Sequence, residues 1–396
     1  MSELLDLENS INREMVDVWH HLHQNPELSM QEYKTADFIE KALREKTGVD
    51  RIKRVGETGL WVELKGADPE RGDIIILRGD MDALPITEQN ALPYCSRSPG
   101  VMHACGHDVH TSALLGAVRV LEKYRERIHG SIWFFFQPGE ESLKGALTFL
   151  NDPEIDIAKV KAVAGIHVAG DLESGKVRLK EGPVLASADP LKFLIKGQGG
   201  HAAYPHGCRD PLVAAANLII QLQTLVSRET SPLDAIVLSL CHIQGGSKDN
   251  VIPNEISIEG TLRALKKETR TYIQEAIRRI CQGIEISLRV SINFEFEGNS
   301  LPLYNDGELI KIAEKAAQKA LGADSVVFAE NPGMAGEDFA FFADKIPGAF
   351  IFIGARTKDG PPASGHNPEF YTDEGAVRTG ILTLASFALE YFGVDF

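Results

Sequence analysis

GSIWFFFQPGEE, residues 130–141, is an apolar run that ends in a polar turn. An apolar run bounded by turn residues in this way predicts a buried strand. Two other runs have the same form, DIIILRGD at 73–80 and KAVAGIHVAG at 161–170, and residues 109–123 between them have the apolar spacing of a helix. Strands that alternate with helices predict an α/β domain with a central, mostly parallel sheet and helices on both faces.

The middle of the chain has a different order of elements. The patterns there predict the order strand, helix, strand, strand, helix, strand. The strands are residues 189–206 and the runs AIVLSLCHIQGG, NEISIEGTLRAL and LRVSINFEFEG, and the helices are residues 209–227 and 267–288. This order is typical of a ferredoxin-like α+β module. A chain of 396 residues is also too long for one simple core. We therefore expect the α/β domain to be interrupted by a smaller inserted domain, which gives the segments 1–187, 188–300 and 301–396.

The composition narrows the class of protein. Hydrophobic residues make up 43% of the chain and charged residues 24%, as in ordinary globular proteins. The formal net charge of −15 disfavours nucleic acid and anionic membrane as partners. No apolar run is long enough for a transmembrane helix, and the polar start MSELLDLENSINREM does not have the form of a signal peptide. Five scattered cysteines fit reduced thiols, so we expect a cytoplasmic protein.

Four polar clusters each follow a predicted strand or open a predicted helix. In open α/β sheets, ligands bind outside the carboxyl ends of the strands. We expect the clusters to converge there on one cleft, and we expect His167 to end its strand. The clusters are RGDMDALP (78–85), HACGHD (103–108), QPGEE (137–141) and GIHV (165–168).

The side chains in these clusters favour a catalytic metal site. Cys105 and His107 are two residues apart, a spacing that suits chelation from a loop. Thiolate and imidazole bind zinc well, and imidazole also suits nickel, cobalt or manganese. The other candidate ligands are scattered and include carboxylates, as in catalytic sites with open positions. In QPGEE, one of Glu140 and Glu141 can bind the metal while the other takes a proton from the bound water.

Each of these residues also has a plainer interpretation. The acids of QPGEE could favour the positive end of a helix dipole. His167 could be a satisfied polar residue, and Asp80 and Asp82 could cap a turn. His103 and His110, which flank the main cluster, are interpreted as hydrogen-bonded or exposed imidazoles.

The motifs taken together resemble those of the M20 metallopeptidase superfamily, and within it the aminoacylase-like amidohydrolases. This branch includes hippurate hydrolases, auxin-conjugate hydrolases and N-acetyldiaminopimelate deacetylases. The resemblance covers nearly the whole chain, in order, through HQNPELS, RGDMDALP, MHACGHD, FQPGEE, GIHV, GQGGHAAYPH, DNVIP, GTLR, GEDFAFF and GHNPEF. It implies a metal-dependent hydrolase that cleaves the amide bond of N-acyl amino acids or related conjugates. It also implies two divalent metal ions per subunit (Zn, Mn, Ni or Co), whose ligands would be Cys105, His107, Glu141, His167 and His366.

The resemblance assigns further roles. Glu140 would be the general base, and Asp82 would orient a group of the metal site. His201 would reach across a homodimer, built by the inserted domain, and stabilise the oxyanion in the partner's site. Asn250, Arg263 and Gly336 would contact the substrate, where an arginine can hold a carboxylate through two parallel hydrogen bonds.

Two rival hypotheses remain open. The first is a thiol hydrolase with Cys105 as nucleophile and His107 or His110 as base. Removal of metal by a chelator would abolish activity in a metallohydrolase and spare it in a thiol hydrolase. The second is a non-catalytic relative that binds metal or an acylated amino acid. The presence of both Glu140 and Glu141 argues against it, because a binding protein needs no general base.

Overall fold

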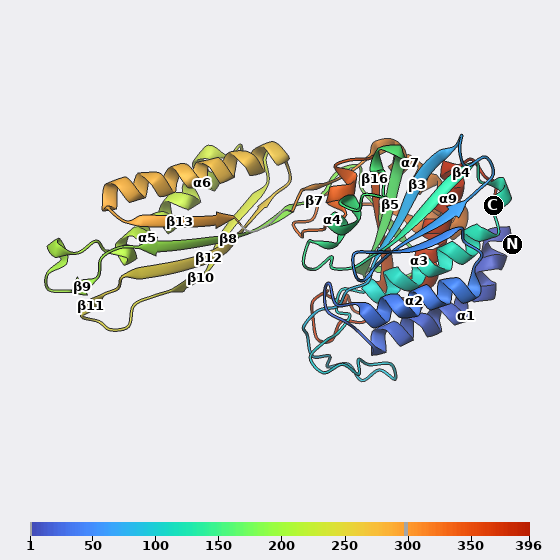
Figure 1. Cartoon of the computed structure of the whole chain (residues 1–396), viewed down its shortest axis with the longest axis horizontal. Helices are drawn as coiled ribbons and strands as arrows, with labels where there is room; N and C mark the ends of the chain where they lie inside the picture. Colours follow the sequence, from blue (N-terminus) through green and yellow to red (C-terminus); the bar gives the residue numbers. More distant parts are fainter. Residues whose placement is uncertain (1, 297–299) are drawn as a thin grey trace. The chain divides into compact units, whose positions relative to one another are not determined.

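The computed structural model describes residues 2–296 and 300–396, and the chain divides into two compact units (Figure 1). The first unit comprises Met1–Val184, Tyr304–Asn331 and Asp338–Phe396. The second unit comprises Leu185–Leu303 and Pro332–Glu337. The short strands β7 (Gly182–Leu185) and β14 (Leu303–Asn305) lie where the chain leaves the first unit and returns to it.

An eight-stranded sheet with the order β1-β2-β4-β3-β5-β16-β6-β15 organises the first unit. The pairs β3/β4, β3/β5, β5/β16 and β6/β15 are parallel, which confirms the predicted mostly parallel sheet. The strands are β1 (Arg51–Val55), β2 (Gly59–Lys65), β3 (Asp73–Asp80), β4 (Gly130–Gln137), β5 (Val160–Glu173), β6 (Val177–Leu179), β15 (Val326–Phe328) and β16 (Gly348–Arg356).

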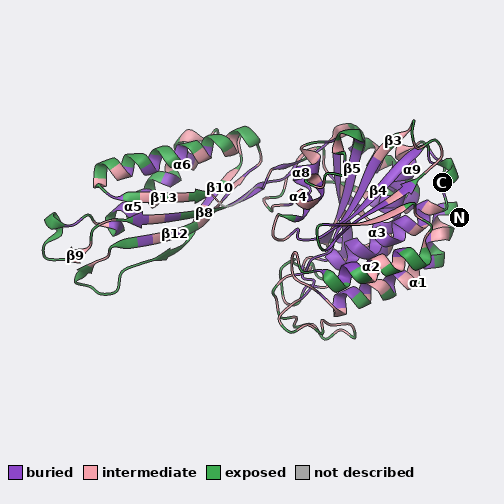
Figure 2. Ribbon diagram, viewed as in Figure 1, coloured by how far each residue is buried: buried purple, intermediate pink, exposed green. Residues whose placement is uncertain are grey.

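Helices cover both faces of this sheet, as predicted for the α/β class. On one face, the apolar stripes of the long helices pack on the sheet and form one large core (Figure 2). On the other face, Phe135 of β4 stacks on Phe149, with ring centroids 4.4 Å apart, and also contacts Phe342. The helices are α1 (Glu3–Gln24), α2 (Tyr33–Lys46), α3 (His107–Glu122), α4 (Gly145–Leu150), α7 (Gly307–Leu321), α8 (Ala340–Ala343) and α9 (Gly375–Tyr391), with 3-10 turns at Arg125–Arg127, Ile157–Lys159 and Ala323–Ser325.

The carboxyl ends of β3 and β4 lie side by side, because Asp80 is paired with Gln137 in the parallel register. The polar clusters that follow these two strands therefore meet, as predicted. The prediction that His167 ends its strand is wrong. Strand β5 continues to Glu173, beyond the end of β3, because β16 supplies hydrogen-bonding partners along its other edge.

The second unit has a four-stranded antiparallel sheet with the order β10-β12-β8-β13. Chain order and strand order together are those of the predicted ferredoxin-like module. Leu218 and Leu222 of α5 and Ile277 and Ile284 of α6 belong to its separate core. The elements are β8 (Ser187–Lys196), β9 (Gly200–His201), α5 (Pro211–Thr224), β10 (Ile236–Gln244), β11 (Val251–Ile252), β12 (Glu255–Ala264), α6 (Lys267–Leu288) and β13 (Ser291–Phe296), with a 3-10 turn at Pro205–Gly207 and a π-helical turn at Leu225–Glu229.

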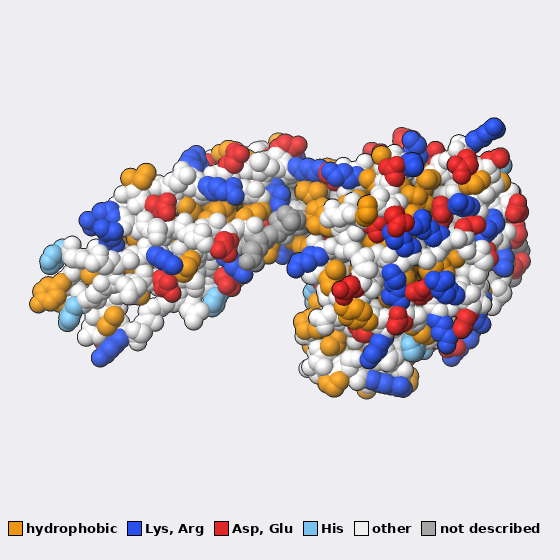
Figure 3. Space-filling model, viewed as in Figure 1, with side chains coloured by type: hydrophobic (Ala, Val, Ile, Leu, Met, Phe, Trp, Pro, Cys, Tyr) orange, Lys and Arg blue, Asp and Glu red, His pale blue; other side chains and the backbone are white. Residues whose placement is uncertain are grey.

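The surface of the first unit carries both signs of charge. On the face drawn in Figure 3, its acidic and basic side chains are interspersed. Exposed ion pairs such as Arg127–Glu3 account for part of this mixture. Within the described residues, no helix is long and apolar enough to cross a membrane.

Candidate metal centre

The turn that precedes α3 brings Cys105 and His107 together. Gly106 caps the helix in the left-handed conformation (φ 83°), so α3 begins at His107, two residues earlier than predicted. A Cβ atom at Gly106 would lie 2.5 Å from Cγ2 of Val168. Only glycine tolerates both conditions without strain, and the two candidate ligands therefore sit on either side of an obligatory glycine.

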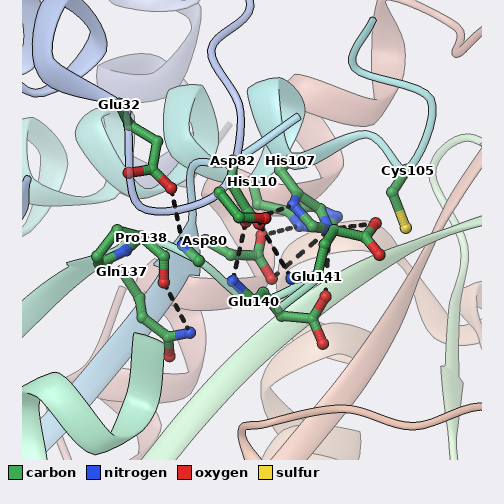
Figure 4. A network of polar contacts seen from close by, with 12 residues as sticks. Glu32, Asp80, Asp82, Cys105, His107, His110, Gln137, Pro138, Glu140 and Glu141 are labelled. Carbon is green, nitrogen blue, oxygen red and sulfur yellow. Dashed lines mark hydrogen bonds and ion pairs between the residues drawn. The ribbon is translucent and has the colours of Figure 1, made fainter. Parts of the chain in front are cut away.

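The turn that follows β4 is held by Asp82. The Asp82 carboxylate accepts the backbone N–H groups of Glu140 and Glu141, each at 3.0 Å, and the hydroxyl of Ser29 at 2.6 Å. Glu32 accepts the N–H of Gly139 in the same turn at 2.8 Å. Figure 4 shows these acids around the turn. Two side chains from outside the turn thus fix the backbone of both glutamates.

His107 is oriented by Asp82, since its Nδ1 lies 3.2 Å from Oδ1 of Asp82. Its Nε2 is buried and has no hydrogen-bond partner among the described residues. That nitrogen lies 4.0 Å from carboxylate oxygens of Asp80, Glu140 and Glu141. Burial opposes protonation, but Asp80 and Cys105 outweigh it and hold the pKa of His107 well above its usual range. A buried nitrogen among so many anionic groups fits a bound cation better than an empty space.

Cys105 and His167 face each other, with Sγ 3.5 Å from Nε2. Nδ1 of His167 donates to the backbone carbonyl of Val168 at 2.8 Å, which leaves Nε2 to contact the thiol or a metal ion. Burial raises the pKa of Cys105, but His167 and His107 outweigh it and lower that pKa to about 6. Burial likewise opposes protonation of His167, whereas Cys105 raises its pKa to about 9. Each group stabilises the charged form of the other.

His366 comes from a distant loop and completes the cluster. Its backbone has a φ of 60°, and its N–H donates to the carbonyl of Ala104 at 2.7 Å. Its Nε2 lies 3.2 Å from Oε1 of Glu141. Cys105 and Glu141 together raise the pKa of His366 to about 10. The unfavourable left-handed backbone of a non-glycine residue is thus retained where it aims an imidazole at the cluster.

Among the described residues, five sets of donor atoms could hold a metal ion, and two of these groups share Cys105. One group is Cys105, His107 and His167, and the other is Cys105, Glu141 and His366. Within each group the donor atoms lie within 4.8 Å of one another. Thiolate, imidazole and carboxylate are a suitable ligand set for zinc and related divalent ions. The buried, unpartnered Nε2 of His107 supports the same fit.

His110 has both ring nitrogens engaged by the protein. Nδ1 lies 2.5 Å from Oδ1 of Asp80, and Nε2 accepts the backbone N–H of Val168 at 2.9 Å. Burial lowers the pKa of His110 to about 4, so the ring is neutral and donates through Nδ1. This is the hydrogen-bonded imidazole that the sequence indicated. The same prediction is wrong for His103, which is buried and has no hydrogen-bond partner for either ring nitrogen among the described residues.

The other predicted site residues belong to the second unit. The exposed His201 lies in β9, and its Nδ1 accepts the N–H of Ala203 at 3.1 Å, so a neutral ring carries its proton on Nε2. The carbonyl of Asn250 accepts the N–H of Ala202 at 3.1 Å, which places Asn250 beside the same turn. Arg263 lies on β12, and its Nε donates to Oγ1 of Thr261 at 3.1 Å. At Gly336, a Cβ atom would lie 2.6 Å from the Cβ of Ala188.

A buried charge network that the sequence did not predict lies next to the cluster. Arg78 is fully buried and donates to the carboxylates of Asp80 and Asp338. Gln137 contacts both Arg78 and Asp338. The only local signal is that Arg78 and Asp80 point to the same face of β3, because side chains alternate along a strand.

The fold and this donor set define a class of protein, the α/β metallohydrolases whose site lies at the carboxyl edge of the sheet. Residues 76–390 match the family described as Peptidase family M20/M25/M40. The chain therefore belongs to this family, which confirms the predicted family and the predicted hydrolase of amide bonds.

The chain is similar to several known proteins over most of its length. The chain is 39% identical to the N-acetyl-L-cysteine deacetylase of Bacillus subtilis (strain 168), over 93% of this chain and 86% of that protein. It is 36% identical to the IAA-amino acid hydrolase ILR1-like 2 of Arabidopsis thaliana, over 95% of this chain and 85% of that protein. A crystal structure of the Bacillus subtilis YXEP protein, described as a dinuclear metal binding peptidase from the M20 family, is 33% identical and has a TM-score of 0.83; the match covers 98% of this chain and 100% of that one.

Proposed function

We propose that the protein is a metal-dependent amidohydrolase that removes the acyl group from N-acyl amino acids or related conjugates. The observation that carries this proposal is the pair of adjacent glutamates beside the donor groups. Glu141 faces His366 and shares a donor group with Cys105, whereas Glu140 shares a group with His107 and Glu141 but not with Cys105. Glu141 would then bind a metal, and its neighbour Glu140 would serve as the base. The deacetylase and the amino acid conjugate hydrolase among the relatives act on substrates of this chemistry, according to their names.

The five predicted ligands would hold two divalent ions. Zn, Mn, Ni and Co all suit this ligand set. The bound ions would supply Lewis-acid polarisation of the attacking water and of the amide carbonyl. The relative described as dinuclear supports a count of two. The ligands would be Cys105, His107, Glu141, His167 and His366.

Glu140 would take the proton from the attacking water and pass it to the nitrogen of the leaving amine. Asp82 fixes this residue, because it accepts the backbone N–H of Glu140 and also orients His107. A general base of this kind contributes about 10²- to 10⁴-fold to the rate.

The second unit would supply substrate contacts. His201 would donate its Nε2 proton to the developing oxyanion in the site of a partner subunit, and this role requires a homodimer. Asn250, Arg263 and Gly336 would line the substrate position, with Arg263 suited to the carboxylate of an amino acid. A cytoplasmic setting would keep the Cys105 thiol reduced.

The decisive experiment is Glu140→Gln, assayed with a panel of N-acetyl, N-benzoyl and longer acyl amino acids in the presence of several divalent ions. We expect unchanged metal content and a loss of turnover of about 10²-fold or more. Near-normal turnover would remove Glu140 as the base. Treatment of the wild type with a chelator distinguishes the metallohydrolase from the rival hypothesis, because a thiol hydrolase with Cys105 as nucleophile would keep its activity without metal.

His201→Asn tests the contribution of the partner subunit. We expect turnover to fall without loss of metal. Mixed dimers of His201→Asn and Glu140→Gln subunits should regain activity if His201 acts in the partner's site, since one of the two sites then has both groups. Mixed dimers without activity would place His201 in the site of its own subunit.

A further inference from the structure

Arg78 lies at the centre of a buried polar network. Its side chain is fully buried on β3 and contacts a residue of the same strand and residues of two other segments of the chain. Nη1 donates to Asp80 at 2.5 Å, Nη2 to Asp338 at 2.9 Å, and Nε to Oε1 of Gln137 at 3.0 Å. The guanidinium is planar and rigid, so it fixes these three groups relative to one another.

Asp338 is held as firmly as Arg78. In addition to Arg78, its carboxylate accepts Nε2 of Gln137, at 2.8 and 3.0 Å to its two oxygens, and the backbone N–H of Ala146 at 2.9 Å. Asp338 is fully buried. Buried charged side chains are tolerated only where hydrogen bonds and opposite charges surround them, and this network meets that condition.

The network ends at the two groups that matter most for the proposed chemistry. The backbone N–H of Asp338 donates to Oε1 of Glu140 at 3.4 Å. This contact is longer than a typical N–H···O hydrogen bond. At the other end, Oδ2 of Asp80 lies 4.0 Å from Nε2 of His107. The two ends are joined through one guanidinium.

We propose that Arg78 and Asp338 are positioning residues for Glu140: the Arg78–Asp338 ion pair sets the place of the Asp338 backbone N–H, and that N–H sets the orientation of the Glu140 carboxylate. This inference rests on the proposed function of Glu140 as general base. Both side chains would act through Glu140. Asp80 keeps the other branch of the guanidinium fixed, because His110 also binds it.

The test compares Arg78→Lys, Asp338→Asn and Gln137→Leu with the wild type. Kinetics use the acyl amino acid that the wild type hydrolyses fastest, at a temperature well below the unfolding of every variant. We expect kcat to fall by about 10- to 100-fold for Arg78→Lys and Asp338→Asn, since misplacement of a catalytic group by about 1 Å has this effect. KM and metal content should change little. Gln137→Leu should give a smaller loss, because it keeps the ion pair.

Arg378→Lys is the matched control. Arg378 also pairs with a buried carboxylate of the first unit, that of Glu8, but neither residue contacts the donor groups. We expect Arg378→Lys to lower the unfolding temperature and to leave kcat of the folded enzyme unchanged. A purely structural role of Arg78 would give the same pattern in Arg78→Lys, and that result would overturn the inference.

Glu140→Gln separates this inference from the proposed function. If Glu140→Gln is inactive while Asp338→Asn and Arg78→Lys keep the wild-type kcat, Glu140 remains the base and only the positioning role fails. If Glu140→Gln is active, the proposed function fails first. If Arg78→Lys does not fold, Asp338→Asn and Gln137→Leu test the inference in its place. The inference is overturned if both variants keep the wild-type kcat, or if both lose metal.

Discussion

Nδ1 of His107 lies 3.2 Å from Oδ1 of Asp82, and this contact determines which nitrogen of His107 is left for a metal. With its proton on Nδ1, the ring presents a lone pair at Nε2, the atom that is buried and unpartnered among the described residues. The same carboxylate accepts the N–H groups of Glu140 and Glu141. One aspartate therefore aligns a predicted ligand with the turn that carries the predicted base.

Asp82→Asn should weaken metal binding by about 10- to 100-fold, because an amide neither enforces the tautomer of His107 nor accepts two N–H groups as a carboxylate does. The measurement is a metal-binding titration of the apoprotein. Ser29→Ala is the control, since it removes one hydrogen bond to Asp82 and leaves the carboxylate in place. If Asp82→Asn binds metal with wild-type affinity, metal binding by His107 does not require Asp82.

The two donor groups share Cys105, which predicts an unequal effect of ligand substitutions. His167→Ala and His366→Ala should each remove one metal ion per subunit and leave the other. Cys105→Ser should weaken both. The measurement is metal content per subunit after dialysis against limiting metal, determined by mass spectrometry. If His167→Ala and His366→Ala deplete the same ion, the division into two groups is wrong.

Thiol labelling should report whether Cys105 is bound to metal. In the metal-free protein the pKa of Cys105 is about 6, because His167 and His107 outweigh the effect of burial, so most of the thiol is ionised at pH 7. We expect a small alkylating reagent to modify Cys105 in chelated protein and metal to protect it, by at least tenfold in rate. Cys281 is the internal control, since burial raises its pKa to about 12. Equal labelling with and without metal would exclude Cys105 as a ligand.

The fold was predictable because its signals are local. The apolar runs at 73–80 and 130–137 each form a strand, and parallel pairing then places the polar turns that follow them at one edge. The second unit was predictable for a related reason, since its order of elements selects the ferredoxin-like arrangement. Family membership and hydrolase class are confirmed by the comparisons. The ligand set and the roles of Glu140, Asp82 and His201 stay predictions.

The parts that sequence reasoning missed depend on long-range geometry. Arg78 and Asp338 are 260 residues apart, and nothing near either residue indicates that they pair. The position of His167 was misjudged because the length of β5 is set by its neighbour β16, not by its own residues. His366 could be placed only through the family resemblance, because its loop reaches the cluster by a backbone bond to Ala104 that no sequence pattern encodes.

His23 is a buried histidine whose charge contributes to the stability of the first unit. Nδ1 lies 2.6 Å from Oδ2 of Asp108, and Nε2 lies 3.2 Å from Oε1 of Glu88. Burial opposes protonation, but the two carboxylates outweigh it and raise the pKa of His23 to about 9. Burial raises the pKa of both carboxylates, but His103 and His23 outweigh it at Asp108, and His23 and other hydrogen-bond donors outweigh it at Glu88, so both pKa values are lowered. The three groups therefore stabilise one another as an ionised set.

The sign of the pH dependence follows from that raised pKa. The unfolded chain has a histidine pKa of about 6.5. The charge of His23 therefore stabilises the folded state fully below pH 6.5, and this contribution is lost as the pH rises through about 9. The shift corresponds to a contribution of up to about 3 kcal/mol to the free energy of unfolding.

Urea unfolding of metal-loaded wild type and His23→Gln should show a large difference in stability at pH 6 that shrinks by pH 10. His129→Gln, at an exposed histidine, should show no such trend. A difference between wild type and His23→Gln that stays constant from pH 6 to pH 10 would mean that His23 is neutral in the folded protein.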